Sequence, residues 1–253
     1  MKSTSTHPVA IISDIHGNLD ALAAVLKDVA AHECITMVCL GDIVGYGPEP
    51  GACVQLVREY ASAVVIGNHE AMLLAILKEG SISREKTGDM WKALALCRKG
   101  LRTDEKRWIR KLPFTVIAQD LSFVHGSLHQ PHEFNYIRNT EDARLTFAAQ
   151  ETPLSFHGHT HVPVVWEEKG KEVTGYVPGD GEIQLDPDCR YAVCVGSVGQ
   201  PRDRDPRASY ALYDLEKHRL VIRRLEYDIK RARERFLGAD LKGFHAMRLA
   251  NGV

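Results

Sequence analysis

The sequence predicts an α/β (α+β) protein in which two β-sheets pack together and helices cover their outer faces. Three observations lead to this prediction. Short apolar runs typical of buried strands alternate with helical patterns in the first half of the chain, and strands dominate the second half. Several of the apolar runs also stop abruptly at glycine and polar side chains. We find no internal repeat and no linker, so residues 1–253 are expected to form one domain.

In the first half, apolar runs predict strands at residues 9–13, 35–40 and 63–66. Apolar positions spaced for one helical face predict a helix over 19–31, which Asn18 can cap. Further helices are expected at 50–60, at 70–78 and at about 84–98. Residues 108–112 are expected to form the end of a short helix. The stretch 45–51 is rich in Gly and Pro and is expected to be a loop.

In the second half, the pattern predicts more strands than helices. The expected strands are 114–118, 121–125, 154–157, 162–166, 191–195, 209–214 and 219–227. Helices are expected at 140–150 and 228–237, and a loop is expected at 177–188.

Composition narrows the classes of partner. A net charge of −1 gives little attraction for a long polyanion or an anionic membrane, so neither partner is expected. No run approaches the roughly 18 apolar residues of a membrane span. The short polar stretch 1–7 does not read as a secretory signal. The six cysteines lack Cys-x-x-Cys spacing, so free thiols in a cytoplasmic protein are expected. The oligomeric state is left open.

Five short polar clusters lie at or after apolar runs. They are Asp14 to Asn18, Gly41-Asp42, Gly67 to Glu70, His125-Gly126 and Gly158 to His161. Because sites in α/β folds lie outside the carboxyl ends of strands, these endings predict one shared site.

The side chains of these clusters suit two divalent cations. Carboxylate oxygen and imidazole nitrogen favour manganese, iron, cobalt, nickel or zinc. Residues at i and i+2 of an extended segment share a face, so Asp14 and His16 are expected to project to one side, and likewise His159 and His161. The Asp42 carboxylate has enough lone pairs to bridge two ions. The seven expected ligands are Asp14, His16, Asp42, Asn68, His125, His159 and His161. Such a pair of cations activates water for in-line displacement, so the pattern indicates a binuclear metal hydrolase.

The ordered motifs resemble those of the calcineurin-like metallophosphoesterase superfamily. The stretches 13–18, 41–48 and 196–203 resemble its small bacterial and archaeal members, and the resemblance runs from about Val9 to Asp228. It implies a four-layer αββα sandwich of two mixed β-sheets flanked by helices, with the metals at one end of both sheets. It also implies a phosphoesterase that hydrolyses a phosphate monoester or diester.

The resemblance also implies a role for each residue. Asp42 would bridge the two ions, and His69 would lie over the phosphate and, as an imidazolium, assist the leaving oxygen. Water would attack phosphorus without a covalent enzyme intermediate. Two divalent ions per chain are expected, with manganese first and iron, zinc, nickel, cobalt or magnesium as alternatives. One ion would be held by Asp14, His16 and His161, and the other by Asn68, His125 and His159.

Two positions depart from the family pattern. Glu70 stands where the family usually has Asp, and its carboxylate is expected either to orient His69 or to cap a helix. Cys194-Val195 stands where related proteins commonly have Asn-Pro, which leaves the shape of the loop near Gly196 open.

Substrate contacts are less well defined by the sequence. Asn18 and Arg202 are the candidates, because the planar guanidinium of Arg202 can grip a phosphate. His129 and His132 either contact substrate or lie on the surface. Tyr46 either anchors its loop or stacks on a base, and the first role is favoured. The basic run 230–235 is expected to be a solvated face.

Several functions compete within this interpretation. The substrate is expected to be a small phosphorylated molecule or a nucleotide, with a dinucleoside polyphosphate or a phosphoprotein as the alternatives. A non-catalytic scaffold ranks below the enzyme, because the chain keeps all seven ligand positions and His69. A nuclease is disfavoured by the near-neutral charge.

Overall fold

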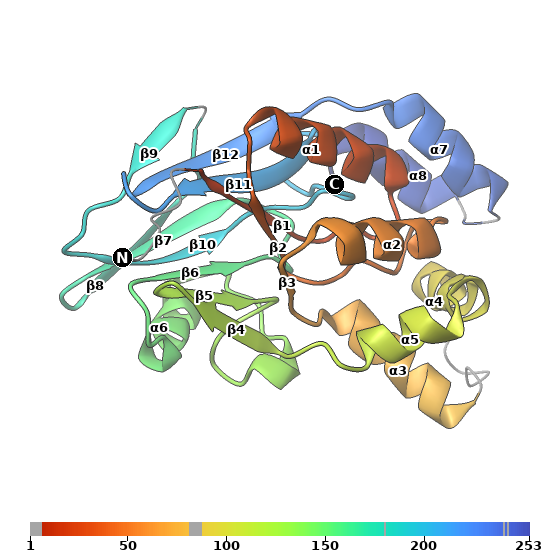
Figure 1. The fold of residues 1–253 in the computed structure, drawn as a ribbon, viewed down its shortest axis with the longest axis horizontal. Helices are drawn as coiled ribbons and strands as arrows, with labels where there is room; N and C mark the ends of the chain where they lie inside the picture. The colour runs from red at the N-terminus through yellow and green to blue at the C-terminus, as the bar shows by residue number, and fades with distance from the viewer. Residues whose placement is uncertain (1–6, 81–87, 180, 240, 242) are drawn as a thin grey trace.

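A computed structural model describes residues 7–80, 88–179, 181–239, 241 and 243–253. Its strands form two mixed six-stranded sheets, A and B (Figure 1). Sheet A runs in the order β3 (Ala63–Val64), β2 (Thr36–Cys39), β1 (Val9–Ile12), β11 (Ala208–Asp214), β12 (Arg219–Leu225) and β9 (Glu182–Gln184). Sheet B runs in the order β4 (Thr115–Ala118), β5 (Leu121–Val124), β6 (Leu154–His157), β10 (Arg190–Cys194), β7 (Val164–Lys169) and β8 (Glu172–Tyr176).

The helices gather on the outer faces of the sheets and at one end of them (Figure 1). They are α1 (Leu19–Ala31), α2 (Pro50–Tyr60), α3 (Asn68–Glu79), α4 (Asp89–Gly100), α5 (Thr103–Ile109), α6 (Thr140–Ala149), α7 (Ile229–Gly238) and α8 (Gly243–Asn251), with a 3₁₀ turn at Pro131–Glu133. The predicted helix at 84–98 begins at Asp89 in the structure, and its residues 84–87 lie outside the described part of the chain. None of the described helices is both long and apolar enough to cross a membrane.

Strand β1 shows why the sheets stack. All four of its residues are buried, because both faces of sheet A are covered. Val9 and Ile11 join the core between the two sheets, where Phe123 of β5 and Phe156 of β6 also lie. The alternate residues Ala10 and Ile12 face the opposite way, into the core shared with the helices.

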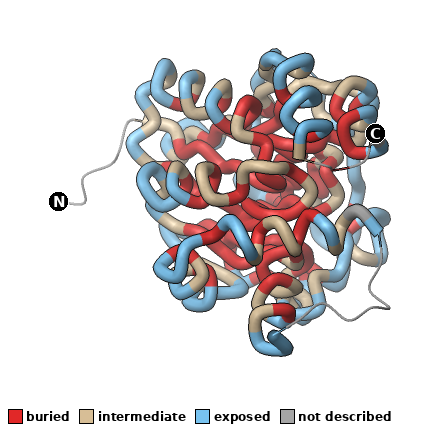
Figure 2. Tube along the Cα trace, turned by 90° about the vertical axis from the view of Figure 1, so that its right-hand side faces the viewer, coloured by how far each residue is buried: buried red, intermediate tan, exposed pale blue. Residues whose placement is uncertain are grey.

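The outer layers complete a four-layer αββα sandwich, as predicted. Helices α1 and α2 cover the free face of sheet A through residues such as Leu22 and Val54, and α3 to α5 lie at the end of the sheets (Figure 1). Helix α6 covers sheet B, where Phe147 packs with Trp166. Seen from the helical end, buried positions concentrate at the centre and exposed positions lie on the outward helix faces (Figure 2).

Helices α7 and α8 add a small core of their own, which includes Phe236 and Leu249. Helix α7 is tied to α1 by Arg231, whose side chain pairs with Asp20. Arg235 of the same basic run pairs with Glu49. Part of the predicted solvated basic face is therefore a helix-docking surface.

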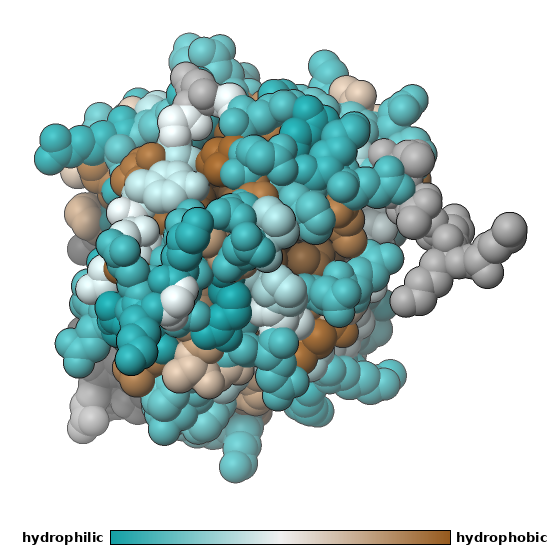
Figure 3. Space-filling view, turned by 90° about the vertical axis from the view of Figure 1, so that its left-hand side faces the viewer, coloured by the Kyte–Doolittle hydropathy of each residue, from teal (hydrophilic) through white to brown (hydrophobic). Residues whose placement is uncertain are grey.

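Several elements differ from the prediction. Strands β8 and β9 were not expected, and β9 lies inside the predicted loop 177–188. They form the outer edges of the sheets, where most of their side chains are exposed and the apolar pattern is weak. Helix α8 was not expected either, and α5 ends at Ile109 where the sequence predicted a helix over 108–112. The end of the molecule that carries β8 and β9 presents mainly hydrophilic side chains, with apolar ones in small separate patches (Figure 3).

Candidate metal centre

The polar clusters converge because their strands are parallel neighbours. Strand β1 pairs in parallel with β2, and β2 pairs in parallel with β3, so the loops after these strands leave the same edge of sheet A. In sheet B, β5 and β6 are also parallel and deliver His125 and the loop 158–161. Backbone hydrogen bonds join these loops, as from Asp14 N to Gly41 O at 3.1 Å and from Gly158 N to His125 O at 2.9 Å.

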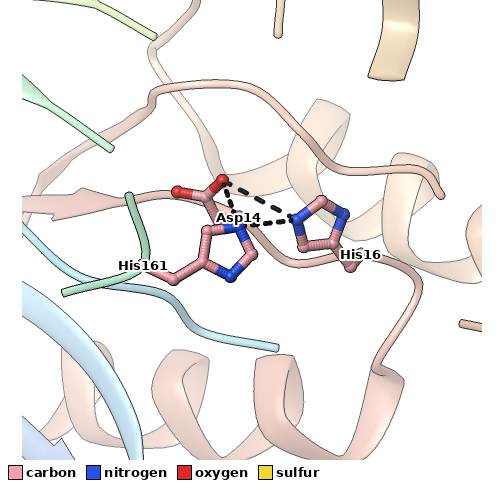
Figure 4. A group of neighbouring side chains, drawn as sticks. All are labelled: Asp14, His16 and His161. Carbon is pink, nitrogen blue, oxygen red and sulfur yellow. Dashed lines mark hydrogen bonds and ion pairs between the residues drawn. The ribbon is translucent and has the colours of Figure 1, made fainter. Parts of the chain in front are cut away.

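One half of the centre contains Asp14, His16 and His161 (Figure 4). The Nε2 atoms of the two imidazoles lie 3.1 Å apart. Asp14 Oδ1 lies 3.2 Å from His161 Nε2 and 3.7 Å from His16 Nε2. All three side chains are buried, and they come from the loop after β1 and the loop after β6.

The other half contains His125, His159 and Asn68. His125 Nε2 lies 3.1 Å from His159 Nδ1 and 3.0 Å from Asn68 Oδ1. Asn68 is the first residue of α3, so the helix begins two residues earlier than the sequence predicted. Its amide therefore projects from a helix N-terminus rather than from a loop.

Asp42 joins the two halves. Its Oδ2 lies 3.7 Å from His16 Nε2 in one half and 3.4 Å from His125 Nε2 in the other. Its Oδ1 accepts a hydrogen bond from the backbone N–H of His69 at 2.9 Å. One carboxylate oxygen is thus fixed by α3, and the other faces both groups of ligands.

Backbone carbonyls orient three of the imidazoles. His125 Nδ1 lies 2.8 Å from Leu40 O, His16 Nδ1 lies 3.2 Å from Val44 O, and His161 Nδ1 lies 2.6 Å from Gln200 O. A carbonyl can only accept, so each of these Nδ1 atoms carries a proton and each Nε2 atom faces the centre. The Nε2 atoms of His16 and His161 then face each other at 3.1 Å, an arrangement that a cation between them would stabilise.

A buried carboxylate oxygen is a second sign that the donor set fits divalent cations. Asp14 Oδ1 is buried and, within the described part of the chain, has no hydrogen-bond donor. Imidazole nitrogens and carboxylate oxygens are the ligands that first-row divalent metals accept. Burial lowers the pKa of His159 to about 3 and that of His161 to about 4, so both rings are neutral and ready to coordinate.

Mutual attraction between carboxylates and imidazoles shifts the pKa values of Asp14, Asp42 and His125. Burial alone would raise the pKa of Asp14, but His161 and His16 hold it well below its usual range. The pKa of Asp42 is lowered in the same way, against burial, by His125 and His69. For His125, burial acts to lower the pKa, but Asp42 and Asp14 outweigh it and raise the pKa to about 9.

The backbone of the ligands is not extended, which corrects the prediction made from their spacing. Asp14, His16, Asp42, His159 and His161 all adopt left-handed conformations, with φ between 49° and 66°. His161 therefore joins Asp14 while His159 joins His125, so the two histidines serve different halves. Gly158 makes this loop possible, because a Cβ there would lie 2.4 Å from Asp14 Oδ2.

Glu70 caps α3 and does not contact the His69 ring in the described structure. Its Oε2 accepts from the backbone N–H of Asp42 at 2.8 Å and of Gly67 at 3.0 Å, and its Oε1 accepts from Val44 N at 3.0 Å. Burial and the Asp42 carboxylate raise the pKa of Glu70 to about 7, against these backbone donors. Of the two roles left open by the sequence, the structure favours the cap, and this cap also holds the Asp42 loop.

The loop after β10 supports the ligands from the other side. Val198 N donates to Ser13 O at 2.9 Å, and Gly199 N donates to Asp14 O at 2.9 Å. Ser197 Oγ donates to the same Asp14 carbonyl at 2.8 Å. The loop thus fits closely against the Asp14 segment although Cys194-Val195 replaces the usual Asn-Pro.

His69 lies beside the ligands. Its Nε2 is 3.9 Å from Asp42 Oδ2, and its ring is 4.7 Å from that of His16, so it also falls within a group that could hold an ion. Burial, together with the neighbouring histidines, outweighs the opposing Asp42 carboxylate and lowers the pKa of His69 to about 3. In the metal-free site the ring is therefore a neutral imidazole, not the imidazolium that the resemblance implies.

The candidate substrate contacts lie on the rim. Asn18 caps α1 by accepting from Ala21 N at 3.2 Å, and its amide donates to Gly199 O at 2.9 Å, so its role toward substrate stays a prediction. Arg202 is half-buried beside the centre, and its backbone N donates to His161 O at 3.2 Å. His132 is exposed and pairs with Glu133.

Sequence reasoning missed two aromatic neighbours. Tyr136 stacks on His159 with ring centroids 3.8 Å apart, and the ring centroids of Phe134 and His125 are 6.0 Å apart. Arg138 in turn lies 3.9 Å over the Tyr136 ring. These residues follow the His125 cluster along the chain, but no motif marks them.

Comparison with known proteins agrees with this geometry. Residues 8–218 match the model of the calcineurin-like phosphoesterase superfamily domain. The crystal structure of a metallophosphoesterase from Sphaerobacter thermophilus is 38% identical and superposes with a TM-score of 0.86, covering 98% of this chain and 100% of that one. A protein of Pyrococcus horikoshii OT3, 19% identical with a TM-score of 0.75 over 97% of this chain and 98% of its own, shares the fold.

Two relatives are similar in sequence. An uncharacterized protein of Methanocaldococcus jannaschii is 34% identical over 96% of this chain and 98% of its own. A symmetrical bis(5'-nucleosyl)-tetraphosphatase of Hamiltonella defensa is 26% identical over 69% of this chain, and the match spans 62% of that protein. The family match covers most of the chain and includes every segment that forms the centre. The chain therefore belongs to the calcineurin-like phosphoesterase superfamily.

Proposed function

We propose that this chain is a binuclear metal-dependent phosphoesterase that cleaves a P–O bond of a small phosphorylated substrate. The observation that carries the proposal is the pair of facing ring nitrogens in each half, His16 with His161 and His125 with His159, each at 3.1 Å. Asp42 Oδ2 lies between the halves, as a bridging ligand would. Manganese is the first candidate ion.

The ligands would divide as the resemblance implies. Asp14, His16 and His161 would hold one cation, and Asn68, His125 and His159 would hold the other, with Asp42 shared. Bound there, two divalent cations would polarise a phosphoryl oxygen and lower the pKa of water, which would supply the nucleophile. The carbonyls of Val44, Leu40 and Gln200 keep three imidazoles oriented for this role.

His69 acts on the leaving oxygen. Its ring is buried beside Asp42, and as a neutral imidazole it keeps one N–H with which to donate a hydrogen bond. The oxygen of the departing group gains negative charge in the transition state, so such a donor stabilises it.

A nucleotide is the favoured substrate class. The similarity to a symmetrical bis(5'-nucleosyl)-tetraphosphatase supports this choice, although that match spans 62% of the relative. A cytoplasmic location is proposed as well, because all six cysteines are free thiols, as is usual in a reducing compartment.

Metal analysis and a substrate panel test the proposal. We expect protein supplied with manganese to retain two ions per chain and to hydrolyse p-nitrophenyl phosphate, its bis ester or diadenosine tetraphosphate, and EDTA to abolish the activity. Protein that retains no ion and stays inert with manganese, nickel, zinc, iron, cobalt and magnesium would instead support the alternative that the chain is a non-catalytic scaffold.

A further inference from the structure

A group of polar and aromatic side chains lies next to the metal centre but is not part of it. Tyr46 packs its ring 4.6 Å from the rings of both His16 and His69. On its other sides lie His245 of α8, at 4.8 Å between ring centroids, and Arg202, whose Cζ is 5.9 Å from the Tyr46 ring. The group therefore adjoins the expected metal ligands through Tyr46.

Helix α8 brings a second arginine to this place. Arg248 follows His245 by three residues on α8, and residues at i and i+3 of a helix are neighbours, so Arg248 lies on the helix face that brings His245 against Tyr46. The pKa of Arg248 agrees with this placement, because burial and the Arg202 guanidinium lower it and Tyr46 acts to raise it. Both arginines are half-buried and open to solvent. Two like charges held together in this way attract an anion.

Neither guanidinium contacts a carboxylate side chain within the described residues. Arg202 donates from Nη2 to Gln200 Oε1 at 3.0 Å, and its buried Nε has no acceptor in the same residues. Arg248 donates from Nε to the backbone oxygen of Val253 and lies 5.3 Å from the Phe244 ring. Donors therefore remain available on both.

Several other arginines in this half of the chain pair with carboxylate side chains. Arg207 pairs with Asp205, Arg224 with Asp203, Arg231 with Asp20, and Arg235 with Glu49. Within the described residues neither Arg202 nor Arg248 has a carboxylate side chain as its partner, and Arg248 bonds instead to the oxygen of Val253, the last residue of the chain. Guanidinium groups bind phosphate oxygens with good geometry.

We propose that Arg202, Arg248 and Tyr46 form a subsite for a second phosphate group of the substrate, beside the phosphate that the metal centre would hold. This inference rests on the proposed function and narrows it to small substrates that carry two or more phosphates, such as nucleoside polyphosphates. A nucleic acid fits less well, because two free cations cannot follow a long polyanion on a chain of net charge −1.

Binding of hydrolysis-resistant probes tests the subsite directly. Calorimetry on manganese-loaded protein would compare methylenediphosphonate with methylphosphonate. We expect the diphosphonate to bind at least about tenfold more tightly, and R202Q and R248Q each to reduce that advantage about tenfold. R233Q removes an exposed charge from α7 and should keep the advantage.

A conservative variant separates binding from folding. R248K retains the positive charge, so it should recover part of the lost advantage, and thermal melting would verify that each variant is folded. A wild type without preference for the diphosphonate would overturn the subsite. The subsite would also be overturned if R202Q and R248Q lowered the affinity for both probes equally. Tighter binding of a dinucleotide than of the diphosphonate would overturn it too.

Kinetics distinguish this inference from the proposed function. For the wild type and the two glutamine variants, the kcat/KM for ADP would be divided by that for p-nitrophenyl phosphate. We expect the ratio to fall about tenfold in both variants. An unchanged ratio would refute the subsite but leave the phosphoesterase standing. A wild type inert toward every ester would refute the phosphoesterase, while calorimetry would still decide the subsite.

Discussion

Asp42 is the residue whose carboxylate lies close to both halves of the centre. Replacing it in D42N keeps the shape but removes the charge and turns one terminal atom into a donor. We expect retained manganese to fall from two ions per chain to one or fewer, and kcat/KM to fall at least about 100-fold. Elemental analysis and steady-state kinetics would measure both. D104N, at an exposed acid of α5, is the matched control, and a D42N protein that keeps two ions would contradict the bridging role.

Glu70 offers a test of the helix cap. E70D restores the residue usual in the family but shortens the side chain, so it cannot reach Asp42 N, Val44 N and Gly67 N together. We expect manganese affinity to fall about 10- to 100-fold and stability to fall by about 1–3 kcal/mol. Calorimetry and urea unfolding would measure these, with E226D on the surface as the control. Unchanged metal affinity in E70D would show that the cap does not position the ligands.

The raised pKa of His125 predicts a pH dependence of metal binding. With a pKa of about 9 in the metal-free protein, this ring is protonated at pH 7 and must lose a proton to coordinate. His159 and His161, whose pKa values are lowered, release none. We therefore expect about one proton to be released per chain at pH 7, and affinity to rise about tenfold per pH unit up to pH 9. Calorimetry in buffers of different ionisation enthalpy would measure the release, and H125N should abolish it. A wild type that releases no proton would contradict the assignment.

The spacing of the ligands could be read from the sequence, but their backbone could not. All of the expected ligands meet in one place in the structure. They could be recognised in the sequence because strand ends and polar clusters are local patterns. The left-handed conformations of His159 and His161 depend on contacts with distant segments, such as the Asp14 carboxylate that accepts from His159 N. For that reason the extended backbone assumed for this segment was wrong, although both histidines reach the centre.

At the scale of elements, Asp28 links helix α1 to sheet A. Its carboxylate accepts from Tyr210 of β11 at 2.6 Å and from Arg223 of β12 at 3.0 Å. Burial acts to raise the pKa of Asp28, but the bonds from Arg223 and Tyr210 lower it. We expect D28N to lose about 1–3 kcal/mol at pH 7. A lowered pKa stabilises the fold above the unfolded value of about 3.9, so the deficit should shrink as the pH falls below that value. Urea unfolding of wild type and D28N from pH 3 to 7 would measure it, and a constant deficit would contradict the ionic linkage.

Central elements were easier to predict than peripheral ones. Strands β1, β2, β5 and β6 are buried on nearly every residue and therefore read as apolar runs. In β8 only Val173 is buried, so its sequence lacks an apolar pattern. Helix α8 exposes Phe244 and Met247, and its place in the fold comes from packing on α7.

At the scale of the molecule, the centre depends on the packing of the two sheets. Sheet A supplies the Asp14 and Asp42 loops, and sheet B supplies His125 and the loop 158–161. Neither sheet alone holds a complete set of ligands, so the core between the sheets also fixes the distances between the halves. This dependence on tertiary packing explains why the order of motifs indicated the site but not its geometry.

Anomalous diffraction from crystals soaked in manganese would test the central claim most directly. The structure predicts two peaks about 3.5–4 Å apart on either side of Asp42 Oδ2, one beside His16 and His161 and the other beside His125 and His159. A single peak, or peaks remote from Asp42, would contradict a binuclear centre.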